Sequence, residues 1–157
     1  VVMQHSRVMT GDIFTNIVGS TGLTLDDAWR AADRAALSEN IKAMPMGMHT
    51  VISQGGGTLS GGQRQRLLIA RALAPQPHVL FFDEATSALD NVTQAAVSQS
   101  LEGLRVTRVV IAHRLSTIRH ADRIFVMERG RIVQSGRFED LVAVEGPFQG
   151  LAKRQMV

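Results

Sequence analysis

Hydrophobic and polar positions follow two different periods along the chain. Apolar residues recur at helical spacing after Thr24, again over residues 38–43, and again after Ser60. Two short unbroken apolar runs, residues 78–82 and 108–112, instead predict strands covered on both faces, as is usual in a parallel sheet. The pattern therefore predicts a mainly helical first part followed by an α/β part.

The two longer helices have clear start and stop signals. Thr24 with Asp27 three residues later forms a capping-box pattern, and Ser60 can cap the helix that Pro75 and Pro77 end. Their spacing predicts inward-facing apolar residues, which are Ala28, Trp29, Ala32, Ala35 and Ala36 in the first helix and Leu67, Leu68, Ala70 and Leu73 in the second. A shorter helix over residues 38–43 is expected to end before Pro45.

The first part also contains two segments without a helical or strand period. Residues 11–18 form a mixed stretch, and residues 45–58, with consecutive glycines at 55–57, are predicted to be a loop. Residues 1–3 are apolar and read as the end of a buried strand.

The second part alternates strands with helices. Asp90 can cap a helix between the two apolar runs, and strand, helix, strand in this order predicts a right-handed parallel crossover. Residues 123–127 and 131–133 are expected to pair through a tight turn as a hairpin. The tail over residues 138–155 is predicted to be helical with a break at Gly146 and Pro147.

Composition narrows the class of protein. With 157 residues, 45% apolar and 20% charged, the chain is expected to fold as one unit, and disordered or collagen-like chains are excluded. It contains no cysteine, which excludes disulfides, thiol catalysis and Cys-ligated metals and agrees with a cytosolic setting. No apolar run reaches the roughly 18 residues of a membrane-spanning helix.

The charge of the chain does not indicate a nucleic-acid partner. Of the 17 basic residues only Lys42 and Lys153 are lysines, yet the net charge is only +3 and no block of like charges occurs. Arginine favours planar partners such as phosphates and carboxylates. Arg64, Arg66 and Arg71 are expected either to pair with acidic groups of a partner subunit or to form a solvated face.

Polar side chains follow the predicted strands directly. Gln4 follows the first apolar run, Asp83 and Glu84 follow the second, and His113 follows the third. Because ligands bind at the carboxyl ends of strands in open parallel sheets, these side chains are expected to meet at one site. One carboxylate there can hold Mg²⁺, the next can activate a water, and the histidine can contact a transferring phosphate. Taken singly, these residues are more typical of a helix cap, a solvated turn or a structural histidine.

A second candidate site lies at the start of a helix. Ser60, Gly61, Gly62 and Gln63 would leave backbone N–H groups uncovered where the helix dipole favours negative charge, and the serine hydroxyl adds a donor. These residues predict an anion site that suits phosphate. The alternative is that the glycines only shape the cap.

Taken together, these segments resemble motifs of the ATPase subunit of ATP-binding-cassette (ABC) transporters. The resemblance covers nearly the whole chain, and five motifs carry it in the family's order. Gln4 resembles the Q-loop glutamine, and residues 59–63, followed by residues 64–66, resemble the signature motif. Further along come a Walker B strand with its glutamate at residues 79–84, a D-loop at residues 87–90 and a switch histidine at His113. The signature motif, residues 83–90 and residues 112–117 are close to the exporter pattern, and residues 146–155 resemble the ending of bacterial peptide or bacteriocin exporters.

The resemblance implies an α/β fold, a partial P-loop NTPase (RecA-like) parallel sheet with an α-helical subdomain. Residues 1–4 would end a core strand with the Q-loop glutamine. Residues 5–75 would form the helical subdomain that ends in the signature helix, and residues 76–157 would form the carboxyl-terminal part of the ATPase core. The segment after Gln4, with the Trp29 helix, would face the coupling helices of a membrane domain.

The resemblance also implies ATP and Mg²⁺ as cofactors and a role for each motif. Asp83 would hold Mg²⁺ together with Gln4, Glu84 would polarise the attacking water, and His113 would contact the γ-phosphate. ATP held mainly by the opposite subunit would be contacted by Ser60, Gly61, Gly62 and Gln63. Asp90 would communicate with that subunit.

The implied partners lie at a membrane. They are a second ATPase subunit, in a homodimer or a heterodimer, and a transmembrane domain fused upstream, so that the chain would lie at the cytoplasmic face of the plasma membrane. No nucleic acid is expected. ATPases of DNA repair carry related signature motifs, but the long insertion they have is not evident between Gln4 and Ser60.

One motif of the family has no counterpart here. Its phosphate loop, rich in glycine with a lysine, precedes the glutamine, whereas only three residues precede Gln4, and neither Lys42 nor Lys153 has a glycine-rich context. The chain is therefore expected to be a carboxyl-terminal fragment that lacks the Walker A loop and does not hydrolyse ATP alone. The alternative is a naturally truncated binding subunit that pairs with an intact ATPase.

Overall fold

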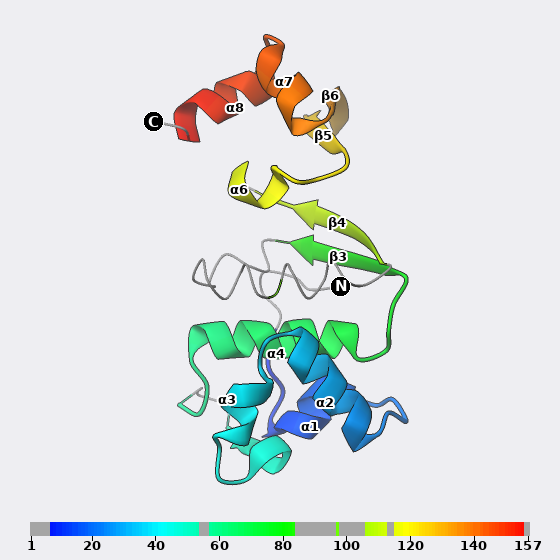
Figure 1. The fold of residues 1–157 in the computed structure, drawn as a ribbon, viewed down its shortest axis with the longest axis vertical. Helices are drawn as coiled ribbons and strands as arrows, with labels where there is room; N and C mark the ends of the chain where they lie inside the picture. The colour runs from blue at the N-terminus through cyan, green and yellow to red at the C-terminus, as the bar shows by residue number, and fades with distance from the viewer. Residues whose placement is uncertain (1–6, 54–56, 84–96, 98–105, 113–114, 156–157) are drawn as a thin grey trace. The chain divides into compact units, whose positions relative to one another are not determined.

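The computed structural model describes residues 7–53, 57–83, 97, 106–112 and 115–155 (Figure 1). It groups the chain into two compact units, Val1–Ile111 and Ala112–Val157. The single folded unit expected from length is therefore wrong. The reason is that the second unit has an apolar cluster of its own, built on Ile124, Val126, Leu141 and Phe148.

Helices dominate the first unit. They are α1 (Ile13–Val18), α2 (Leu25–Arg34), α3 (Ser38–Lys42), the 3₁₀ turn η1 (Gly47–His49) and α4 (Gly61–Leu73). Both α1 and α2 pack against α4, which lies above them in Figure 1. The core they enclose includes Ile13, Ile17, Ala28, Ala32, Leu67 and Ile69.

Local sequence signals set the ends of these helices. The capping box predicted for α2 is confirmed, because the Thr24 hydroxyl accepts the N–H of Asp27 and the Asp27 carboxylate accepts the N–H of Thr24 at 2.8 Å. The predicted inward positions Ala28, Ala32 and Ala35 are buried. The helix over residues 38–43 is also confirmed, as α3.

Replacing Thr24 with alanine is expected to lower the free energy of unfolding of the first unit by about 1 kcal/mol, because the first turn of α2 loses its capping oxygen. Trp29 is the chain's one tryptophan and lies in α2, so its fluorescence during urea unfolding measures the change. Thr24→Ser keeps a hydroxyl and is the control. Equal loss in both variants would contradict the role of the cap.

Two segments of the first unit have more structure than their sequence predicted. Residues 11–18, a mixed stretch in the sequence, contain β1 (Gly11–Asp12) followed by α1, which Asp12 caps by accepting the N–H of Thr15 at 2.8 Å. Residues 45–58 are not all loop, because they contain η1 and β2 (Val51–Ile52), which pairs antiparallel with β1. Elements of two to six residues are too short to display a period, which explains why the pattern missed them.

The two apolar runs form a parallel pair of strands. β3 (Val79–Asp83) pairs with β4 (Thr107–Ile111) in register from Val79 opposite Thr107 to Asp83 opposite Ile111. The predicted parallel pairing is confirmed, whereas the helix expected after Asp90 lies outside the described residues.

Coverage of these strands on both faces is a wrong prediction for this chain. In β3, Leu80 and Phe82 are buried, but Val79 and Phe81 are 46% and 48% exposed. All five residues of β4 are exposed. The core of the first unit therefore covers one face of β3 only, so an unbroken apolar run here does not mean burial on both sides.

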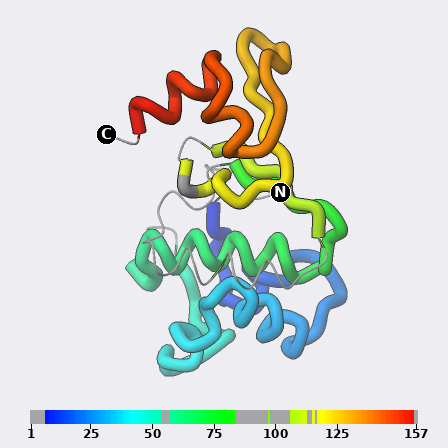
Figure 2. The backbone as a smooth tube through the Cα atoms, turned by 45° about the horizontal axis from the view of Figure 1, so that its top comes forward, coloured from blue at the N-terminus to red at the C-terminus, as the bar shows by residue number. Residues whose placement is uncertain are grey.

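The second unit is a hairpin followed by two helices, with a short helix before it. Its elements are α6 (Leu115–Ile118), β5 (Ile124–Glu128), β6 (Arg131–Gly136), α7 (Phe138–Ala143) and α8 (Pro147–Gln155), which Figure 2 traces from yellow to red. Arg129 and Gly130 have φ angles of 49° and 76°, the left-handed pair that a two-residue hairpin turn needs. The predicted hairpin and the helical break are both confirmed.

An edge-to-face aromatic pair helps to hold the end of the chain. The rings of Phe138 in α7 and Phe148 in α8 lie 5.6 Å apart at 87°.

Within the part of the chain that the structure describes, no helix combines the length and the apolar character that crossing a membrane requires.

Candidate functional site

The structure describes only part of the predicted site. Ser60, Gly61, Gly62 and Gln63 lie at the start of α4, and Asp83 is the last residue of β3. The other predicted site residues lie outside the described residues, and they are Gln4, Glu84, Asp90 and His113.

A complete capping box starts α4. Ser60 has extended backbone angles, and its Oγ accepts the N–H of Gln63 at 3.2 Å. In return the N–H of Ser60 donates to Oε1 of Gln63 at 2.9 Å. The cap is therefore made by the serine and the glutamine side chains, while the two glycines between them contribute backbone only.

The start of α4 is open to a ligand or partner. The N–H groups of Gly61 and Gly62 belong to the first turn, for which a helix offers no carbonyl partner, and the hydroxyl of Ser60 keeps its own hydrogen to donate. Gly61 is exposed, and a Cβ added to it would meet no atom within 4 Å. Packing within this chain therefore does not require glycine at position 61, whereas close approach of an outside group to the backbone would.

The loop before this cap is anchored from inside. Leu59 is only 3% exposed and belongs to the core of the first unit. Its carbonyl accepts a hydrogen bond from Nε of Arg64 at 3.3 Å, so the residue before the cap and the second turn of the helix are tied together. This anchoring fixes the position of Ser60 while its backbone stays exposed.

Asp83 brings a single carboxylate to the end of β3. It is partly exposed, and it lies opposite Ile111 in the parallel register. β3 points in the direction opposite to α4, back toward the end of the first unit at which α4 starts (Figure 1). No group of three metal-ligating side chains occurs among the described residues. A single strand-end carboxylate suits Mg²⁺ that keeps its waters and is shared with phosphates.

Two arginines of α4 bond to carbonyls inside the chain. Arg66 donates to the carbonyl of Ala36 at 2.9 Å, and Arg71 donates to the carbonyl of Asn16 at 2.6 Å. Arg71 is therefore held by carbonyl groups of its own chain rather than lying on a solvated face, whereas pairing of these arginines with a partner subunit stays a prediction. Asn16 was missed from sequence, although a polar residue between the apolar Ile13 and Ile17 was the signal that could have found it.

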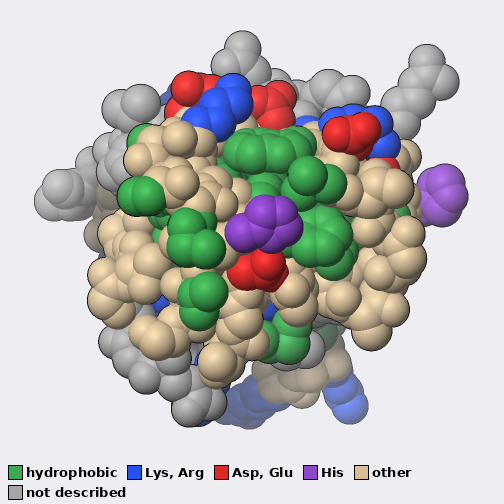
Figure 3. Space-filling model, turned by 90° about the horizontal axis from the view of Figure 1, so that it is seen from below, with side chains coloured by type: hydrophobic (Ala, Val, Ile, Leu, Met, Phe, Trp, Pro, Cys, Tyr) green, Lys and Arg blue, Asp and Glu red, His purple; other side chains and the backbone are tan. Residues whose placement is uncertain are grey.

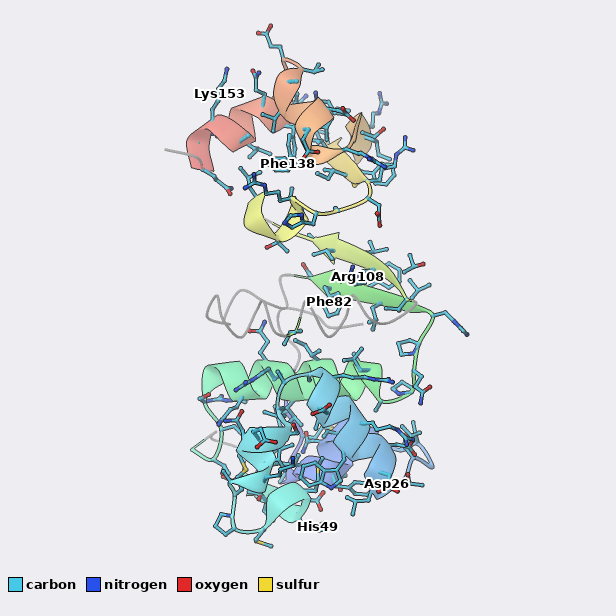
Figure 4. The ribbon with its side chains drawn as sticks, in the orientation of Figure 1. Asp26, His49, Phe82, Arg108, Phe138 and Lys153 are labelled. Carbon is cyan, nitrogen blue, oxygen red and sulfur yellow. The ribbon has the colours of Figure 1, made fainter. Side chains whose placement is uncertain are left out.

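The far end of the helical part carries a histidine and aspartate pair. His49 Nδ1 lies 3.1 Å from Oδ2 of Asp12, and the ring of Phe14 lies 6.3 Å from the His49 ring. Figure 4 labels His49 at this end, and Figure 3, which looks onto it, shows hydrophobic side chains gathered around a histidine beside an acidic group.

Comparisons with known proteins were made once this geometry was in hand. Residues 1–87 match a family model described as ABC transporter. The chain is 45% identical over 151 residues to the mycobactin import ATP-binding/permease protein IrtB of Mycolicibacterium thermoresistibile, covering 94% of this chain and 26% of that protein. It is also 45% identical over 160 residues to the β-(1→2)glucan export ATP-binding/permease protein NdvA of Rhodopseudomonas palustris, covering 100% of this chain and 26% of that protein.

A solved structure shares the fold. The structure of a bacterial Atm1-family ABC exporter with ATP bound matches with a TM-score of 0.94 and 36% identity, covering 99% of this chain and 28% of that one. The chain thus spans about a quarter of the length of the curated relatives it matches.

Proposed function

The chain belongs to the ABC transporter family, and from that premise we propose that it is part of the motor that binds and hydrolyses ATP to drive an exporter-type transporter. Its fold is a partial α/β P-loop NTPase fold with an α-helical subdomain. The observation that carries the proposal is the open, capped start of α4, where Gly61 leaves the backbone bare.

In the proposed arrangement the start of α4 faces ATP that a second ATPase subunit holds. The N–H groups of Gly61 and Gly62 and the hydroxyl of Ser60 supply donors for phosphate oxygens, and the helix dipole adds to their attraction. Gln63 fixes this geometry by accepting the N–H of Ser60. The role is one of positioning and electrostatic stabilisation, which dominate phosphoryl transfer.

The strand ends supply the remaining roles in this proposal. Asp83, with Gln4, holds Mg²⁺, which when bound neutralises charge on the phosphates. Glu84 polarises the attacking water, His113 contacts the γ-phosphate and Asp90 communicates with the second subunit. The position of Asp83 at the carboxyl end of a parallel strand supports this assignment.

The proposed partners follow from the relatives, whose names pair an ATP-binding part with a permease. They are a second ATPase subunit, in a homodimer or a heterodimer, and a transmembrane domain fused upstream, with this chain at the cytoplasmic face of the plasma membrane. We keep the division into residues 1–4, 5–75 and 76–157 as part of the proposal. Peptide export also stays a prediction, because one relative is named for import of mycobactin and the other for export of a glucan.

The variant Gly61→Asp tests the proposed function, because stability and activity should change in different directions. A carboxylate at the first helical position interacts well with the dipole, so the free energy of unfolding is expected to hold or to rise by about 0.5 kcal/mol. A like charge facing phosphate costs several kcal/mol, so ATPase activity of the whole gene product, including any residues encoded before Val1, is expected to fall about 100-fold.

The matched control is Gly22→Asp. Gly22 lies just before the capped start of another helix of the first unit, α2, and a Cβ there, as at Gly61, meets no atom within 4 Å. Its ATPase activity is expected to equal that of the parent protein. Full activity in Gly61→Asp, or the absence of a phosphate loop from the sequence upstream of Val1, would contradict the proposed motor function.

A further inference from the structure

A half-buried guanidinium joins the last turn of α4 to α1 and to the segment before it. Arg71 donates from Nε to the main-chain oxygen of Asn16 at 2.6 Å and from Nη2 to Oδ1 of Asn16, also at 2.6 Å. Its Nη1 donates to the main-chain oxygen of Arg7 at 3.2 Å. These bonds connect parts of the chain that lie 55 and 64 residues apart in sequence.

Asn16 uses the rest of its amide to hold the same segment. The residue is 0% exposed, and its Nδ2 donates to the carbonyl of Met9 at 2.9 Å and to the carbonyl of Asp12 at 3.0 Å. Its Oδ1 also accepts the N–H of Met9 at 2.8 Å. Residues 7–12 are therefore fastened to α1 and α4 by one polar network, which we call the Asn16–Arg71 clamp.

The clamp takes the guanidinium of Arg71 partly out of water. Burial lowers the pKa of the Arg71 guanidinium, because desolvation penalises its charged form. The acceptors that face it in the clamp are neutral carbonyl and amide oxygens. Such a network contributes a defined geometry more than stability, since its donors are satisfied in one arrangement only.

The two ends of α4 serve different segments. Gly61 to Gln63 form the first turn of the helix, and the clamp binds its last turn. The helix is about 20 Å long, because its 13 residues rise about 1.5 Å each. The clamped residues 7–12 stand directly after the segment that contains Gln4 in the sequence. A rigid helix gripped at one end transmits any tilt of its other end.

We propose that Asn16 and Arg71 are positioning residues that make α4 and residues 7–12 move as one piece, so that engagement of Ser60–Gln63 with nucleotide is relayed to the segment that follows Gln4. The proposal rests on the proposed function, because it assumes that the start of α4 meets a nucleotide. It adds a mechanical link between two motifs that this chain holds far apart in sequence.

A spin label on Thr10→Cys tests the clamp in the whole gene product, with any cysteine outside this chain replaced by serine. Thr10 is exposed, and the chain has no cysteine of its own. Mg²⁺ with AMP-PNP is expected to change the label's spectrum in the parent. Arg71→Met and Asn16→Ala are expected to reduce that change about fivefold or more, with AMP-PNP affinity held within about twofold.

Two further variants separate the clamp from a general effect of charge. Arg71→Lys keeps the charge but loses the planar fork, so it is expected to show a partial response. Arg30→Met is the matched control, because Arg30 pairs with Asp27 on the surface of α2 and lies outside the clamp. It is expected to keep the full response.

Each remaining outcome decides the proposal. A full spectral response in Arg71→Met overturns it, and failure of both Arg71 variants to fold also overturns it, because the clamp then serves folding alone. If the parent does not bind AMP-PNP, the proposed function is wrong. Amide hydrogen exchange then tests separately whether Asn16 and Arg71 hold residues 7–12 to α4. Arg71→Met must then speed amide exchange in residues 7–12 about tenfold and leave α2 unchanged, and equal exchange overturns it.

Discussion

Replacing Glu84 with glutamine is expected to lower ATP hydrolysis by the whole gene product about 100- to 10,000-fold, the range that loss of a general base produces. Glu84 directly follows Asp83, with which β3 ends. Glutamine keeps the size of the side chain but cannot accept a proton from water. ATP binding should persist, so a filter-binding assay beside a phosphate-release assay separates the two steps.

The matched control for this variant is Glu128→Gln. Glu128 is an exposed glutamate at the end of another strand, β5, but it precedes a hairpin turn rather than a site motif. It is expected to leave hydrolysis unchanged. The 157-residue chain alone is expected to be inactive, because it holds no phosphate loop.

Results with these proteins also separate the two functions considered for the chain. Hydrolysis that survives in Glu84→Gln would remove Glu84 from the catalytic role. Absence of hydrolysis from the whole gene product, combined with binding to an intact ATPase subunit, would instead favour a binding subunit without activity of its own.

Features set by neighbouring residues could be predicted from the sequence. The caps at Thr24 and Ser60 need only a hydroxyl and a side chain three residues later; the capping box at Thr24 and the cap at Ser60 both formed as expected, and Gln63 completes a box at Ser60. The hairpin turn at Arg129 and Gly130 likewise depends on local backbone angles. Such features can be predicted because the interacting groups are close in sequence.

Features set by distant residues could not be predicted. The clamp joins Arg71 to Asn16 across 55 residues, and no local pattern specifies that pairing. Burial of β3 also depends on which elements cover it, and Phe81 is exposed although its run is entirely apolar. For the site, the sequence motifs predicted the capped start of α4, while the roles of Gln4, Glu84, Asp90 and His113 stay predictions.

Truncating Leu67 to alanine is expected to lower the free energy of unfolding of the first unit by about 3 kcal/mol, because it removes apolar surface and leaves a cavity. Leu67 is 0% exposed on α4, the helix against which α1 and α2 both pack. Neighbours fixed on both sides cannot move together to fill the space. Urea unfolding followed by the fluorescence of Trp29 reports on this unit, since Trp29 packs against the same core.

The control for Leu67 is Leu25→Ala, which makes the same truncation in the same unit. Leu25 starts α2 and is 42% exposed, so its replacement creates no enclosed cavity and is expected to cost less than about 1 kcal/mol. A similar loss at both positions would contradict a core centred on α4. A large loss at Leu67 alone would show that the helix that presents Ser60 to Gln63 is held by the packing of its buried face.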